Sequence, residues 1–135
     1  MQPYETPGLT RPKRILSWTL RLVAGAAFLL AGGAKLAGLP MMVGVFDQIG
    51  FGQWFRIFTG IVEVAGAIGL LLPATVAFAG LALSAVMVCA ALTHLFLIGG
   101  SPLPALLLLH ATGFVTWLHR DAFDALRGGE KPLPG

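Results

Sequence analysis

Long apolar stretches, separated by short breaks rich in glycine and proline, dominate the pattern of this chain. The longest uncharged stretch, residues 64–119, contains no Asp, Glu, Lys or Arg. A water-soluble domain cannot leave so much chain uncharged, because most of its surface must face water. The apolar stretches therefore predict membrane-spanning helices over residues 15–37, 54–72, 74–98 and 103–118, the last of them slightly short for a full crossing.

The segments outside the predicted spans differ in character. Residues 1–14 contain several prolines and no periodicity, and we expect a disordered basic tail. Residues 41–53 are apolar but short and interrupted by glycines, and they carry Asp47 and Gln48, so we expect an interfacial segment lying on the bilayer. Residues 120–135 form a charged tail rich in glycine and proline. The expected fold class is all-α: an integral membrane bundle of four transmembrane helices, 15–119, with up-down topology and left-handed packing.

Composition and charge strengthen this interpretation. Hydrophobic residues make up 56% of the chain and charged residues 11%, whereas soluble domains carry about 25% charged residues. The net charge of +3 is too small to suggest nucleic-acid binding. Basic residues gather near both ends of the chain, which predicts that both termini are cytoplasmic in a bacterial-type inner membrane. These residues are Arg11, Lys13, Arg14, Arg120, Arg127 and Lys131.

Each predicted span carries a stripe at heptad spacing, which is typical of left-handed helical bundles. In each span the polar residues share their stripe with small residues, as expected where helix backbones approach closely inside a membrane. We therefore expect the stripes to line the interior. They are Arg21, Gly25, Phe28, Gly32 and Lys35; Arg56, Gly60, Glu63, Ala67 and Leu70; Gly80, Leu83, Met87, Ala90 and His94; and Leu106, His110, Gly113 and Trp117.

Glu63, near the middle of the second span, is the main candidate for function. A carboxylate inside a membrane is costly and marks a functional site by default. With a rise of about 1.5 Å per residue, several polar side chains fall in the same outer half of the membrane and can form one pocket with it. The pocket candidates are Glu63, Lys35, His94, Arg56 and His110. Arg21 lies alone in the inner half.

Structural alternatives stay open for these residues. Lys35 and Arg56 can extend to the membrane surface, the histidines can act as neutral hydrogen-bonding groups, and Glu63 can form a purely structural charge pair. A haem held by His94 and His110 is a third interpretation, but their depths differ by about 4 Å. No closed set of zinc ligands is present, and the single cysteine excludes an internal disulfide. We therefore expect no metal site.

Several short motifs make the chain resemble the DoxX family of small four-helix membrane proteins. They are Arg21-Leu-Val-Ala-Gly25, Gly32-Gly-Ala-Lys35-Leu, the linker ending Ile49-Gly-Phe, and the run 59–72 with its Gly60-x-x-Glu63-x-x-Gly66 core. The resemblance covers about residues 15–119, although the turn after Leu72 lacks the basic residue common in that family. It implies membership of, or partnership with, membrane redox complexes; related four-helix proteins in animals are assembly factors.

Two hypotheses about function follow. The first is a redox-linked accessory subunit whose outer pocket receives a quinone or another lipophilic molecule, with Glu63 accepting or relaying protons. The second is a non-enzymatic assembly or scaffold protein that binds a partner membrane protein. No nucleophile–base pair, phosphate-binding loop or metal motif is present, so we do not expect an enzyme acting alone. Apart from a quinone, no cofactor is expected; a homo-oligomer is left open.

Overall fold

The computed structural model describes residues 8–128, and these residues fold into helices without any strand. The predicted tails at 1–7 and 129–135 lie outside the described residues. In chain order the elements are α1 (Arg11–Ala37), α2 (Pro40–Ile49), α3 (Gln53–Leu71), α4 (Val76–Thr93), η1 (His94–Ile98), α5 (Leu103–Leu118) and α6 (Asp121–Leu126). The short η1 is a π-helical continuation of α4.

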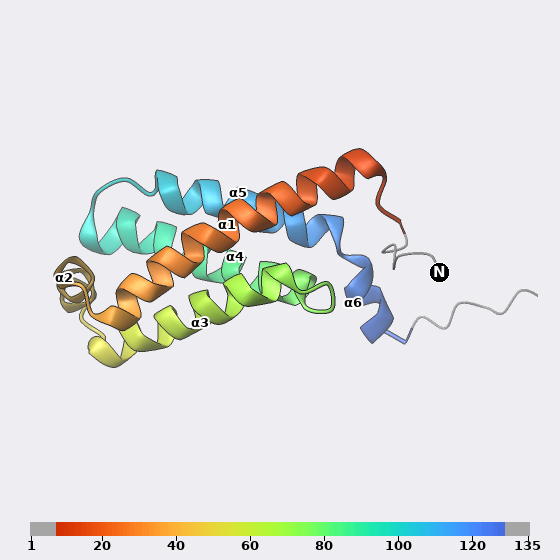
Figure 1. Ribbon diagram of the computed structural model, residues 1–135. Helices are drawn as coiled ribbons and strands as arrows, with labels where there is room; N and C mark the ends of the chain where they lie inside the picture. Colours follow the sequence, from red (N-terminus) through yellow and green to blue (C-terminus); the bar gives the residue numbers. More distant parts are fainter. Residues whose placement is uncertain (1–7, 129–135) are drawn as a thin grey trace, which may run out of the picture.

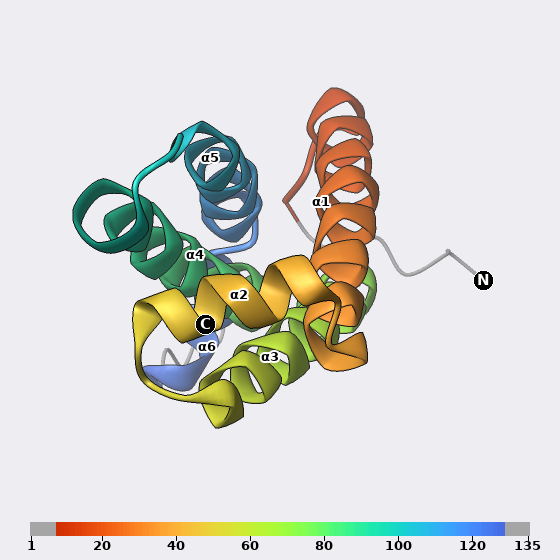
Figure 2. The same cartoon turned by 90° about the vertical axis from the view of Figure 1, so that its left-hand side faces the viewer.

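Four of the helices lie side by side and alternate in direction in the order α1, α3, α4, α5 (Figure 1). α2 is seen end-on in Figure 1 and from the side in Figure 2, so it lies across one end of the other helices. Its position at the membrane interface stays a prediction. α6 lies at the opposite end, near the beginning of α1. We refer to these two ends of the molecule as the α2 end and the α6 end.

Three helical segments in the described chain are long and apolar enough to cross a membrane: Arg11–Ala37, Gln53–Leu71 and Val76–Ile98. The last segment joins α4 to η1 and contains 23 residues. α5 is apolar but has only 16 residues, which gives it about 24 Å of length. Three of the four predicted spans are therefore helices of sufficient length and apolar character to cross a membrane, and the fourth crossing stays a prediction.

Contacts between neighbouring helices build the core. α1 packs mainly on α3, α3 on α4, and α4 on α5, while α1 also touches α5. Phe28, Leu70 and Leu83 are fully buried where these helices meet. Gly66 leaves room for the Leu83 side chain, because a Cβ atom at Gly66 would lie 2.6 Å from it. Packing of small residues holds membrane helices together because lipid provides no hydrophobic driving force between them.

The boundaries differ from the predictions at both ends of the chain. α1 begins at Arg11, so residues 11–14, predicted as part of a disordered tail, are helical. Pro12 favours this start, because proline fits the first turn of a helix. The predicted charged tail also contains a helix, α6, whose Phe123 ring packs edge-on against Phe78 of α4 at 5.1 Å. That contact anchors a segment whose composition alone is typical of a loop.

The predicted inward stripe of the fourth span is wrong. Leu106, His110 and Trp117 are exposed, and α5 instead buries Ala105, Thr112, Val115 and Leu118. The Thr112 hydroxyl lies 2.8 Å from that of Ser84 on α4, which fixes the buried face. Because α5 is apolar on all sides, its periodicity gives almost no information on which face is buried. The stripes predicted for the other three spans do face the interior at most of their positions.

Candidate functional site

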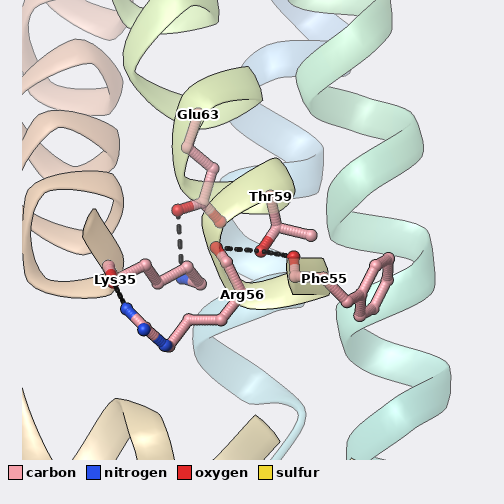
Figure 3. Close-up of polar contacts among 5 residues, drawn as sticks. All are labelled: Lys35, Phe55, Arg56, Thr59 and Glu63. Atoms are coloured by element: carbon pink, nitrogen blue, oxygen red, sulfur yellow. Dashed lines mark hydrogen bonds and ion pairs between the residues drawn. The ribbon is translucent and has the colours of Figure 1, made fainter. Parts of the chain in front are cut away.

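An ion pair between α1 and α3 forms the centre of the candidate site. The Nζ of Lys35, in the last turn of α1, lies 3.0 Å from Oε2 of Glu63 in the middle of α3 (Figure 3). The two side chains are 14% and 4% exposed. An ionised carboxylate and an ammonium are stable at such depth only when each compensates the other. The predicted partnership of Lys35 with Glu63 is therefore present in the structure.

Two glycines bring the helices close enough for this pair. A Cβ atom at Gly32 of α1 would lie 2.9 Å from the carbonyl oxygen of Gly60 and 3.1 Å from Cβ of Glu63. A Cβ atom at Gly60 of α3 would lie 3.1 Å from Cβ of Lys35. Any larger residue at either position would push the backbones apart. The alternation of small and charged residues along both helices thus positions the ion pair.

Arg56 extends the polar contacts toward the α2 end. Its Nη1 donates a hydrogen bond to the backbone carbonyl of Lys35, in the last turn of α1 (Figure 3). Its Nε donates to Oε1 of Gln53 at 2.6 Å, and the Gln53 amide donates to Oδ1 of Asp47 at 2.7 Å and to the carbonyl of Val43 at 3.0 Å. This network ties α1, α2 and α3 together and places a cation at the negative end of the α1 dipole.

The ion pair keeps unused hydrogen-bonding capacity. Oε1 of Glu63 has no hydrogen-bond partner among the described residues, and the ammonium of Lys35 uses one of its three donors (Figure 3). Thr59 does not use this capacity, because its hydroxyl bonds to the Phe55 and Arg56 carbonyls of its own helix. The Glu63 carboxylate can therefore accept a further hydrogen bond from a bound ligand, and the Lys35 ammonium can donate hydrogen bonds to it.

The two histidines predicted for the pocket do not join this site. His94 begins η1, and its Nδ1 lies 3.0 Å from the carbonyl oxygen of Gly99. His110 is exposed on α5, and its Nδ1 lies 2.7 Å from the carbonyl oxygen of Leu106 in its own helix. Of the five predicted pocket residues, the structure thus brings together Lys35, Arg56 and Glu63. Within residues 8–128, no group of three or more His, Cys, Asp or Glu side chains is placed to hold a metal ion.

Arg21, predicted to lie alone, is the centre of a second polar cluster toward the α6 end. It is buried, its Nε donates to the carbonyl of Leu70 in the last turn of α3, and its guanidinium lies 3.8 Å from the centre of the Trp18 ring. One helical turn before Arg21, the buried hydroxyl of Ser17 lies 2.8 Å from Nε2 of His119. This cluster connects α1 with α3 and with the residue that follows α5.

Ser17 and His119 were missed by the sequence reasoning. Ser17 lies four residues before Arg21 on the same buried stripe, a signal that was available. His119 follows the last residue of α5 and looks like the start of a polar tail. Burial, and then the positive charge of Arg21, lower the pKa of the His119 imidazole, while Asp121 opposes the shift. His119 is thus a half-buried hydrogen-bonding group that is uncharged in the neutral pH range.

Comparison with known proteins gives one match. A family profile described as the DoxX-like family matches residues 19–118, which include Arg21, Lys35, Arg56 and Glu63. No curated protein and no solved structure matches the chain.

Proposed function

Because the chain belongs to the DoxX-like family and has helices long and apolar enough to cross a membrane, we propose that it is an accessory subunit of a membrane redox complex. In this proposal the Lys35–Glu63 pair binds a quinone, or another small lipophilic molecule with hydrogen-bonding oxygens. The chain itself is a membrane protein of that family, and the redox partner and the ligand are what we propose.

One observation carries the proposal: a buried ion pair in an apolar helix pair retains free donors and a free acceptor. A purely structural ion pair at this depth would be more stable if every lone pair and every N–H group had a hydrogen-bond partner, because unpaired groups leave the desolvation cost uncompensated. A quinone carbonyl matches the remaining N–H groups of Lys35, and a quinol hydroxyl matches Oε1 of Glu63. Ionisable residues within membrane helices generally mark ligand or proton pathways.

The chemistry divides between this chain and its partner. Reduction of a quinone to a quinol consumes two electrons and two protons, and the electrons would come from the partner complex. Lys35 would hold one ligand oxygen by a charge-assisted hydrogen bond. Glu63 would deliver a proton to that ligand, or accept one from a quinol, and exchange it with water. The α1–α3 glycine contact would keep both side chains in register during the exchange.

A second function, a non-enzymatic assembly or scaffold protein, is favoured by a different observation. The Lys35–Glu63 pair, the Arg56 contact with the Lys35 carbonyl and the Arg21 contact with the Leu70 carbonyl all join the same two helices. Polar groups that hold α1 against α3 would make a rigid unit whose remaining surface is free to bind a partner membrane protein.

A double-mutant experiment distinguishes the two functions. Removing one member of a buried ion pair strands the other charge, so Glu63→Leu or Lys35→Met alone should lower the free energy of unfolding by about 3–5 kcal/mol. The double variant Lys35→Met/Glu63→Leu should recover most of that loss. If the pair binds a ligand, the double variant should regain stability but not affinity. It should bind a short-chain ubiquinone at least tenfold more weakly than the parent, as measured by fluorescence titration in mild detergent.

The matched control is His110→Gln, which changes an exposed polar residue of the membrane helices outside the site. It should leave both stability and ubiquinone binding unchanged. A stable double variant that binds ubiquinone as tightly as the parent would contradict the ligand-binding proposal and support the scaffold.

A further inference from the structure

Arg21 has a hydrogen-bonding donor that the protein does not satisfy. The residue is 3% exposed, and its Nη2 is buried without a hydrogen-bond acceptor within the described chain. A buried cation ordinarily requires a nearby negative charge. No acidic side chain in residues 8–128 forms an ion pair with Arg21, and the ion pair that the structure does contain, Lys35–Glu63, is separated from it along α1.

Two neighbours compensate Arg21 in part. The Leu70 carbonyl belongs to the last turn of α3, where the helix dipole places partial negative charge, and the Trp18 ring attracts the guanidinium through its π face. Both contacts leave Nη2 without a partner. A whole positive charge therefore remains only partly balanced in an apolar environment, and an anion placed nearby would gain from it.

A pocket at the α6 end is connected to this charge through His119, which lines the pocket and interacts electrostatically with Arg21. Its volume is about 240 Å³, and its lining includes Lys13 at the start of α1, the ring of His119, and Arg120 and Asp121 at the start of α6. His119 belongs both to this lining and to the cluster around Arg21, through its 2.8 Å contact with Ser17. The charged side chains of the lining are thus two cations and one acid, with the Arg21 cation behind His119.

His119 offers a further donor to a ligand. The Ser17 hydroxyl can donate to Nε2, which places the imidazole proton on Nδ1, and Nδ1 has no partner among the described residues. The nearby positive charge of Arg21 favours this neutral form of the ring. Lys13 and Arg120 also line the pocket. Nη1 of Arg120 donates to the Trp117 carbonyl at 2.8 Å, but its guanidinium has further N–H donors, so residues with donors of three chemical types surround the pocket.

We propose that this pocket binds a phosphate group, carried by an anionic phospholipid headgroup or free in solution. A phosphate has several acceptor oxygens, which match Lys13, His119 and Arg120, and its negative charge would compensate Arg21. Trp18 and Trp117 lie near this end of α1 and α5, and tryptophans are typical of the depth at which lipid headgroups lie. The site shares no residue with the Lys35–Glu63 pair and extends beyond the function proposed above.

Native mass spectrometry of the detergent-solubilised protein tests this proposal by titration with phosphatidylglycerol and, separately, with phosphatidylcholine. The parent should bind phosphatidylglycerol on the order of tenfold more tightly, because only that headgroup carries net negative charge. Lys13→Gln/Arg120→Gln should abolish this preference. The matched control Arg11→Gln/Arg127→Gln removes the same charge from exposed positions outside the pocket lining and should retain it.

Inorganic phosphate forms the second arm of the experiment. If phosphate at millimolar concentration raises the thermal stability of the parent and of the control, but not of the pocket variant, the ligand is free phosphate. A phosphatidylglycerol preference without a phosphate effect identifies the lipid headgroup. Arg21→Met should weaken the binding of either ligand. If the Arg21→Met protein does not fold, the variant with substitutions at the exposed Lys13 and Arg120 still tests the proposal.

Two results would overturn the proposal. The first is a parent that neither prefers phosphatidylglycerol over phosphatidylcholine nor responds to phosphate. The second is an equal loss of binding in the pocket variant and in the control variant, which would show attraction to the general basic surface instead of a site. Neither result bears on quinone binding at Lys35–Glu63, so the two proposals fail separately.

Discussion

At the scale of single residues, the buried Arg21 and the half-buried Arg56 have reciprocal roles. Arg21 of α1 donates to the carbonyl of Leu70 near the end of α3, and Arg56 of α3 donates to the carbonyl of Lys35 near the end of α1. Because α1 and α3 are antiparallel, each cation lies at the negative end of its neighbour's dipole (Figure 1). The sequence identified both arginines as candidates, but their acceptors are backbone carbonyls, which no residue type reveals.

His119 makes the stability of the protein depend on pH. Its pKa is lowered by burial and by Arg21, so the unfolded chain binds a proton more readily than the folded one. The contribution of His119 to stability is complete above the ordinary imidazole pKa of about 6.5 and is lost as the pH falls toward the lowered folded value. Thermal unfolding in detergent between pH 8 and pH 5 should show this decrease.

The variant His119→Gln should flatten that part of the pH profile, because an amide can still meet Ser17 but does not titrate. His110→Gln replaces an imidazole that bonds within its own helix and lies outside the Ser17–His119 contact, so it is the matched control for the substitution itself. A parent and a His119→Gln protein with the same pH dependence would show that His119 does not contribute to it.

At the scale of elements, the sequence predicted best where polar and apolar residues alternate. α1 and α3 carry charges and glycines on one face, so their contact and the Lys35–Glu63 pair could be predicted. α2 could be recognised as too short to cross, with a polar pair in an apolar segment. α5 could not be oriented, because its only strong polar residue, His110, bonds to its own backbone and faces outward.

The α1–α3 contact leads to a prediction about Gly32. A methyl group there would meet the Gly60 carbonyl at 2.9 Å, so Gly32→Ala should separate the helices and lower the free energy of unfolding by about 1–3 kcal/mol. The neighbouring Gly33 is the matched control, because a methyl group at that position meets nothing within 4 Å. Gly33→Ala should be neutral or slightly stabilising, since alanine favours helices more than glycine does.

Thermal unfolding of both variants in the same detergent checks this comparison. Gly32→Ala should also weaken any ligand binding that depends on Lys35 and Glu63, because the pair would be pulled apart. Equal stability of the two alanine variants would mean that the helices do not approach each other as closely as the structure shows.

At the scale of the whole molecule, hydropathy predicted the all-helical membrane class. The described residues are helical without strands, and three segments are long and apolar enough to cross a membrane. The candidate site was predicted in part, because Lys35, Arg56 and Glu63 fall in the same half of the predicted bundle on facing stripes. The cluster around Arg21 could not be assembled from the sequence. Ser17 and His119 are 102 residues apart, and only the return of the chain to the α6 end brings them together.

The orientation of the molecule in its membrane is the last prediction. In the described chain, the α6 end carries Arg11, Lys13, Arg14, Arg120 and Arg127, while the basic residues toward the α2 end are Lys35 and Arg56, both held in polar contacts. Positive residues outside the spans favour the cytoplasmic side, so the α6 end should be cytoplasmic. Single cysteines in a Cys89→Ala background, probed in intact cells with a membrane-impermeant thiol reagent, test this.

The informative positions are exposed and lie at opposite ends: Ser101 in the turn before α5, and Thr10 and Leu126 near α6. Ser101→Cys should be labelled, whereas Thr10→Cys and Leu126→Cys should react only after the cells are opened. This result would also require α5 to cross the membrane despite its 16 residues, because Ser101 and Leu126 flank that helix. Labelling of Ser101→Cys and Leu126→Cys but not of Thr10→Cys in intact cells would show that α5 does not cross. The reverse of the expected pattern would place the Lys35–Glu63 pair nearer the cytoplasm.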